Sequence, residues 1–67
     1  MDIRAIVGLN VLRIRRERAL SQEELSHRSR LTRAYLSGFE AGRRNPTIVS
    51  LSRLAEALGV DVKDLVS

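Results

Sequence analysis

The sequence predicts an all-α fold, a compact bundle of five short helices. Capping residues followed by apolar residues mark helix starts near positions 22, 33 and 62. Apolar side chains recur every three or four residues, which is the spacing of one helix face. No segment alternates apolar and polar residues as a half-buried strand does, and the connections are short. We therefore expect helices packed on helices around one core.

The first helix is expected from about Arg4 to Arg18, and it carries two apolar stripes. One stripe is the kind that packs on a core, and it consists of Val7, Val11 and Ile14. The second stripe provides more apolar surface than one small core requires. Its residues either pack in the core or contact another subunit: Ile3, Ile6, Leu9 and Leu12.

The second helix is predicted to start at Gln22. Ser21 is suited to cap it, with Glu24 completing a capping box and Leu20 placed to meet Leu25 as a hydrophobic staple. This combination is a strong local start signal, because it satisfies two backbone N–H groups and fixes the entry of the chain.

The third helix repeats the cap and the staple, with Thr32 as the cap but without an acidic partner, so it is expected to begin at Arg33. Leu31, Leu36 and Phe39 turn inward, with Tyr35 at the edge of that arc. Only residues 29–31 separate this helix from the second, so the two are expected to meet steeply as a helix-turn-helix.

The fourth helix is predicted to start at Asn45-Pro46-Thr47, with Pro46 in its first turn, and to end at Gly59. Its apolar residues fall at helical spacing: Ile48, Leu51, Leu54, Ala55 and Leu58. A fifth helix should follow Asp61, which is placed to cap it with Asp64 as partner.

Charge is unevenly distributed along the chain. The 67 residues include twelve basic and eight acidic side chains, a net charge of +4, and eleven of the basic ones are arginine. Residues 1–45 have a balance of +5, whereas residues 46–67 have a balance of −1. Arginine is suited to planar contacts with phosphates and base edges. One end of the molecule is therefore expected to attract polyanions, the alternative being a solvated charged surface.

Composition argues against several functional classes. The chain has no cysteine and one histidine, His27, so neither a thiol nucleophile nor a zinc site is expected. It shows no phosphate-binding glycine loop, no nucleophile elbow, no export leader and no apolar run of bilayer length. We expect one domain over residues 1–67 in the reducing cytoplasm, not an enzyme, with no cofactor, no membrane contact and no evident small-molecule ligand.

The outer face of the third helix carries short side chains. Arg33, Ala34, Ser37 and Gly38 are expected to face away from the core. A glycine inside a helix costs about 0.5–1 kcal/mol relative to alanine. Ala34 and Gly38 would form a low strip that allows the helix backbone to approach the base edges of a DNA major groove. The alternative is that Gly38 is a tolerated weak spot on an exposed face.

The run from Gly8 through Leu65 resembles the lambda-repressor-like helix-turn-helix domain of the phage repressor and Cro class. The resemblance lies in the segments "RIRRERALSQEEL", "YLSGFEAGRRNPT" and "LAEALGV", in this order and spacing. Within that class, "TRAYLSGFEAGRRNPT" is most similar to the small controller proteins of restriction-modification systems.

The resemblance implies roles for individual residues. The positions near base edges are Thr32, Arg33, Ala34, Ser37 and Gly38. The positions near DNA phosphates are Gln22, Tyr35, Arg43, Arg44 and Asn45. A structural ion pair is implied between Arg15 and Glu40. Gly42 is a candidate left-handed helix stop. An arginine can donate two hydrogen bonds to guanine, so Arg33 is the leading candidate for base recognition.

One departure from the family pattern lies in the turn. Members usually have glycine after a small residue, whereas this chain has Ser29-Arg30. A left-handed backbone strains any residue with a side chain. Either the turn is rearranged or the strain is tolerated.

The sequence thus predicts a sequence-specific transcriptional regulator that places residues 33–40 in the major groove of a palindromic operator on double-stranded DNA. A homodimer is expected, with half-sites about 34 Å apart, and its expected contacts are Val62, Leu65 and Val66. Two alternatives are an antitoxin or adaptor that uses the apolar stripes to bind a protein, and a non-specific polyanion binder.

Overall fold

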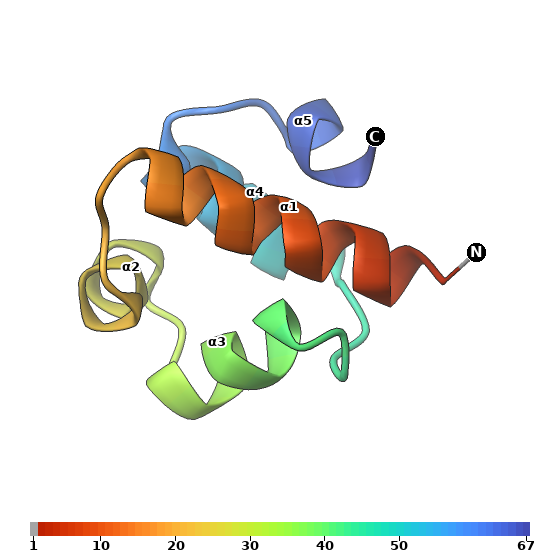
Figure 1. Ribbon diagram of the computed structural model, residues 1–67, viewed down its shortest axis with the longest axis horizontal. Helices are drawn as coiled ribbons and strands as arrows, with labels where there is room; N and C mark the ends of the chain where they lie inside the picture. Colours follow the sequence, from red (N-terminus) through yellow and green to blue (C-terminus); the bar gives the residue numbers. More distant parts are fainter. Residues whose placement is uncertain (1) are drawn as a thin grey trace.

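The computed structural model describes residues 2–67, and this part of the chain contains helices and no strands. Five helices follow one another, joined by short turns and loops (Figure 1): α1 (Ile3–Glu17), α2 (Gln22–Ser29), α3 (Arg33–Glu40), α4 (Ile48–Leu58) and α5 (Val62–Val66). The starts predicted at residues 22, 33 and 62 are confirmed. The all-α fold is therefore the one that the local signals predicted.

Hydrogen bonds at the helix starts explain why these predictions held. The N–H of Glu24 donates to Ser21 Oγ at 3.0 Å, and the N–H of Ser21 donates back to a Glu24 carboxylate oxygen at 3.0 Å. This hydrogen bond lowers the pKa of the Glu24 carboxyl below its usual value. The N–H of Asp61 donates to Asp64 Oδ2 at 3.0 Å. The capping box of α2 is thus complete, whereas in α5 the Asp61 side chain makes no cap hydrogen bond.

The start of α4 differs from the prediction. Its cap is Thr47, whose Oγ1 accepts from the N–H of Ser50 at 3.0 Å, so Pro46 precedes the cap and lies outside the first turn. Ile48 is 75% exposed and does not belong to the core stripe of α4. The hydroxyl of the N-cap residue Thr47 sets the helix start, whereas the prediction relies on Pro46.

The core is formed by one cluster of apolar side chains from all five helices, plus Leu20 from the turn before α2. Val7, Val11 and Ile14 of α1 belong to it as predicted. The second stripe of α1 does not join them, because Ile3 is 46% and Leu9 63% exposed. The core also includes Leu20, Leu25, Leu36, Phe39, Leu51, Leu54, Ala55, Leu58 and Leu65.

The turn after α2 keeps a left-handed residue. Arg30 has φ 62° and ψ 26°, so the expected alternative of a rearranged turn is wrong and the strain is tolerated. Gly42 (φ 76°) and Gly59 (φ 73°) adopt the same region without that strain, as expected for helix stops.

Gly8 allows α1 to cross the C-terminal end of α3 closely. A Cβ at Gly8 would contact the carbonyl oxygen of Phe39, and it would lie 3.1 Å from that of Glu40 and 3.2 Å from the nitrogen of Gly42. These are backbone atoms, which cannot swing aside as a side chain can. The close crossing therefore depends on the absence of a side chain at this position.

An ion pair ties α1 to the end of α3, as the resemblance implied. Arg15 donates from Nε to Glu40 Oε2 at 2.6 Å and from Nη2 to Oε1 at 3.0 Å. The side chains are only 12% and 5% exposed. Hydrogen bonding to the Glu40 carboxylate raises the pKa of Arg15 above its usual value. Gln22 connects α2 to this ion pair, because its amide donates to Glu40 Oε1 at 2.9 Å.

We predict that Gly8→Ala destabilises the protein, although alanine is normally the better helix former. Overpacking of this kind costs about 1–3 kcal/mol, and urea unfolding measures it. Arg16→Ala on the exposed face of the same helix is the control and should shift stability by less than about 0.5 kcal/mol. A Gly8→Ala variant at least as stable as the wild type would contradict the close crossing.

We also predict that Glu40→Gln costs about 3–5 kcal/mol, because it leaves the largely buried Arg15 charge without its partner. The matched control is Glu17→Gln, which breaks the exposed Arg13–Glu17 pair (3.2 Å) and should cost about 0.5 kcal/mol or less. Both are measured by urea unfolding. Equal losses in the two variants would show that burial does not strengthen the Arg15–Glu40 pair.

Candidate nucleic-acid interface

The outer face of α3 lies on the surface, with short side chains and one arginine. Arg33, Ala34 and Ser37 are exposed, whereas Leu36 and Phe39 on the opposite side are buried. The helix starts where it does because Thr32 Oγ1 accepts from the N–H of Tyr35 at 3.1 Å. Thr32 itself is exposed at the tip of this face.

Gly38 differs from the expectation that it lies open on this face. It is buried, because the side chain of Arg44 lies across it. A Cβ at Gly38 would stand 3.1 Å from Arg44 Nε and 3.3 Å from its Cγ. The low strip along α3 is therefore open at Ala34 and covered at Gly38. The missing side chain makes room for an arginine of the following loop.

Tyr35 contacts the same arginine. The guanidinium carbon of Arg44 lies 5.3 Å from the centre of the Tyr35 ring, within cation–π range. The Tyr35 ring in turn packs beside that of Phe39, with centroids 5.9 Å apart. Since Phe39 is in the core, the position of Arg44 is fixed through Tyr35.

The loop after α3 is also tied to the helix by its backbone. The N–H of Arg43 donates to the carbonyl of Gly38 at 2.9 Å. Arg43, Arg44 and Asn45 are all exposed as residues. The three loop positions implied to lie near phosphates are thus held together beside the end of α3.

The side chain of Gln22 has a structural role, whereas the resemblance implied a phosphate contact. Its amide nitrogen is directed to Glu40. What remains for an anion is the backbone N–H of this first residue of α2, because the first N–H groups of a helix have no partner within it.

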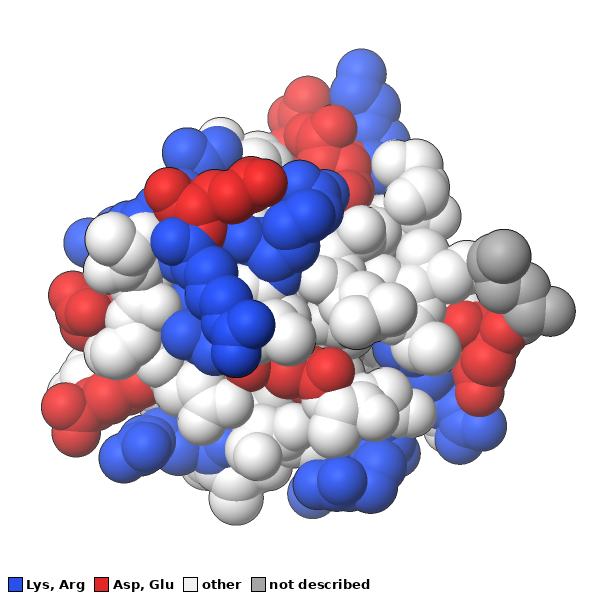
Figure 2. Space-filling model, in the orientation of Figure 1, with Lys and Arg blue, Asp and Glu red and all other residues white. Residues whose placement is uncertain are grey.

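The basic side chains of this region are not neutralised by neighbours. Among residues 2–67, ion pairs join Arg4 to Asp2, Arg13 to Glu17 and Arg15 to Glu40, and none includes an arginine of α3 or its loop. Figure 2 shows basic side chains along the lower edge of the molecule, where Figure 1 has α3 and the loop after it. This edge can attract a polyanion.

The C-terminal residues divide into buried and exposed positions. Leu65 is completely buried, so the expectation that its side chain contacts a second subunit is wrong. Val62 is partly buried against the core, and Val66 is 39% exposed. The short α5 uses Leu65 to attach itself to the core, a role that its spacing alone could not separate from a subunit contact.

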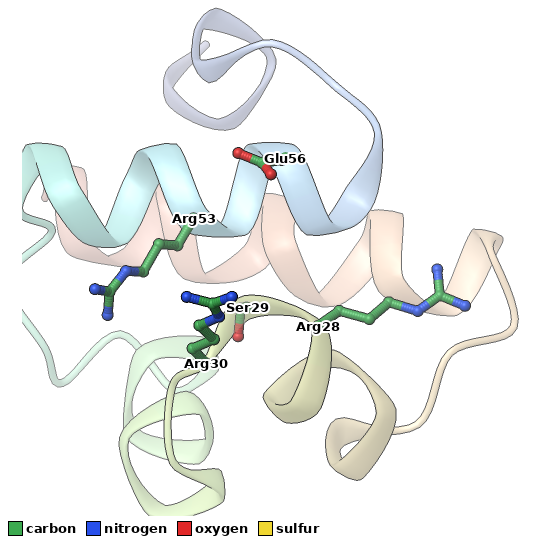
Figure 3. Close-up of a pocket in the computed structure, with 5 residues that line it drawn as sticks. All are labelled: Arg28, Ser29, Arg30, Arg53 and Glu56. Carbon is green, nitrogen blue, oxygen red and sulfur yellow. The ribbon is translucent and has the colours of Figure 1, made fainter.

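Sequence reasoning did not single out a pocket between the turn after α2 and helix α4 (Figure 3). Its volume is about 330 Å³, and we call it the arginine pocket. It is lined by Arg28, Ser29, Arg30, Arg53 and Glu56. No sequence signal pairs these residues, because α2 and α4 meet only through the fold.

Neither a cluster of metal ligands nor a membrane-spanning helix is found among the described residues. Within residues 2–67, no three His, Asp or Glu side chains come together as metal ligands, and His27 is exposed as expected. None of the helices in this range is long and apolar enough to cross a bilayer.

Comparison with known proteins places this geometry in a family. A family model described as helix-turn-helix matches residues 11–65. The uncharacterized HTH-type transcriptional regulator y4dJ of Sinorhizobium fredii is 52% identical over 67 residues, which cover 100% of this chain and 87% of that protein. Control protein C.BamHI of Bacillus amyloliquefaciens is 38% identical over 65 residues, 96% of this chain and 80% of that one.

The solved structures include one of similar size. The restriction-modification controller protein C.AhdI from Aeromonas hydrophila superposes with a TM-score of 0.89 at 35% identity, covering 92% of this chain and 94% of that chain. The chain therefore belongs to the helix-turn-helix family, together with these transcriptional regulators and restriction-modification controller proteins.

Proposed function

We propose that the protein is a transcriptional regulator that binds a palindromic operator as a homodimer, with α3 of each copy in a major groove. The observation that carries this proposal is the outer face of α3, where Ala34 and Ser37 are exposed and Arg33 stands at the first turn. A major groove about 12 Å wide admits a helix. Short side chains allow the helix backbone to approach the base edges. The proposal includes no catalytic step, and it places the protein in the cytoplasm, in contact with DNA.

Within this proposal the residues of the interface have separate tasks. Arg33 donates to a guanine, Ala34 contacts a thymine methyl, and Thr32 and Ser37 offer hydroxyls to neighbouring base edges. Phosphate contacts come from Arg43, Asn45 and the N-terminus of α2, and they add affinity without sequence information. Arg44 covers Gly38 on α3, so within this proposal its guanidinium binds the DNA next to the groove that holds α3.

For the second copy we propose a surface that we call the α1–α5 face, formed by Ile3, Leu9 and Val66. The two helices are joined here, since the Asn10 amide donates to the carbonyl of Leu65 at 2.9 Å. Figure 2 shows uncharged side chains over the N-terminal half of α1, with acidic and basic side chains above them in the region of α5. A standard interface buries about 800 Å² per partner, about a fifth of the 4228 Å² of this surface.

The arrangement suits a two-fold dimer on DNA. In Figure 1 the N-terminal half of α1 and the C-terminus lie at the same end of the molecule, and the loop after α3 reaches toward it. Two copies paired through this end can both direct α3 to one side, with half-sites about 34 Å apart. Selection of bound sequences from a randomised duplex pool, together with the solution mass, tests the proposal as a whole.

An antitoxin or adaptor remains the second candidate, because Ile48 and Val49 at the start of α4 add exposed apolar surface, 75% and 56%. Such a protein would use this surface for a protein partner and would not enrich any duplex. A regulator should prefer its site about 10³-fold or more over random DNA, whereas a non-specific polyanion binder would show only a steep salt dependence.

We predict that Arg33→Ala relaxes base preference at one position per half-site, at a cost of about 1–3 kcal/mol for the preferred base. Repeating the duplex selection with this variant measures it. Arg43→Ala is the matched control, since it removes the same charge from the loop. It should weaken binding equally on all sequences and reduce the salt slope by about one. If Arg33→Ala weakened all sequences equally, the base-reading role would be excluded.

We further predict that Leu9→Ser together with Val66→Ser converts a dimer to a monomer, because it makes the α1–α5 face polar without touching the core. Sedimentation equilibrium measures the mass. The control Val49→Ser lies outside the face and should leave the mass unchanged. A double variant that still sediments as a dimer would exclude this face as the interface.

A further inference from the structure

We infer that the arginine pocket holds a phosphate of the DNA that α3 contacts, and this inference rests on the proposed function. The pocket is built by three segments that are distant in sequence: the end of α2, the turn after it, and the middle of α4. Its charged side chains are three arginines and one glutamate, which leaves an excess of positive charge.

The arginines of the pocket lack protein partners. Within residues 2–67 none of Arg28, Arg30 and Arg53 takes part in an ion pair. Figure 3 shows the guanidinium of Arg30 between the turn and α4, with Arg53 extending from α4 on the same side. Glu56 on α4 forms no ion pair with these arginines, and Arg28 extends away from Arg30 and Arg53. Arg30 and Arg53 are thus free to bind an anion.

A phosphodiester is the anion that this place favours. Arg30 lies only three residues before Arg33, so the pocket stands directly beside the N-terminal end of α3. A helix in the major groove is flanked by the two phosphate backbones. Guanidinium groups pair with phosphate oxygens through two parallel hydrogen bonds. A backbone phosphate beside the start of α3 is therefore the nearest group that matches the pocket.

The backbone of Arg30 supports a functional role for its side chain. At φ 62° glycine would be free of strain, and arginine is not. Residues held in such conformations concentrate at functional sites. The chain thus carries a guanidinium at a position where the turn alone favours glycine.

The experiment measures the salt dependence of DNA binding for Arg30→Gly, Arg53→Ala and the double variant. Each single change should make the negative slope of log K against log salt less steep. The double change should reduce the magnitude of the slope by about one rather than two, because both side chains share one phosphate. Base preference in the duplex selection should stay as in the wild type. Lys63→Ala on α5, which lies across α1 from α3 in Figure 1, is the charge-matched control and should leave the slope unchanged.

Arg30→Gly also separates binding from folding. Relief of the left-handed strain should raise the Tm by about 2–5 °C while DNA binding weakens. A double variant with the wild-type slope, alongside an Arg43→Ala variant with a reduced slope, would overturn the inference and would favour an acidic protein segment as the occupant. If the wild type prefers no sequence, the proposed function fails, but the slope on random duplex still tests the pocket.

Discussion

The orientation of α3 depends on a single carboxylate. Glu40 accepts from Arg15 on α1 and from Gln22 on α2, so three helices meet at one side chain that is only 5% exposed. Arg15 also donates to the carbonyl of Leu20 at 2.9 Å. This hydrogen bond connects the turn before α2 to the same group of side chains. The charges of Arg15 and Glu40 are largely removed from water. A shift of α1 or α3 would therefore leave a buried charge without its partner. Helix-turn-helix geometry is thus fixed at the inner end of α3, away from the exposed Arg33.

The same end of α3 orders the loop that follows it. Gly8 lets α1 approach the carbonyls of Phe39 and Glu40, and Gly38 lets Arg44 lie flat against the helix. Each missing side chain is filled by a neighbour, so neither glycine is a defect of its helix. An ordered loop loses less conformational entropy when it binds than a mobile one does. The proposed phosphate contacts are therefore arranged before DNA arrives.

Local signals and tertiary contacts explain what the sequence could predict. Ser21 and Thr32 fixed helix starts, because a cap satisfies backbone groups within a few residues. The Arg15–Glu40 pair came from the resemblance, since no local rule joins residues 25 positions apart. The burial of Leu65 and Gly38 and the arginine pocket depend on which helices meet. Periodicity identifies a helix face but not the element that covers it.

The small size of the chain links its two proposed surfaces. A chain of this length buries only about 60% of the surface that it exposes when unfolded, and Leu9 is 63% exposed. A second copy that covers this face adds burial that one copy cannot supply. In the proposed complex, DNA with two half-sites would hold both copies together and raise their effective concentration. While most free chains are monomers, the dimer concentration rises with the square of the chain concentration. The occupancy of an operator would therefore respond steeply to the amount of this protein.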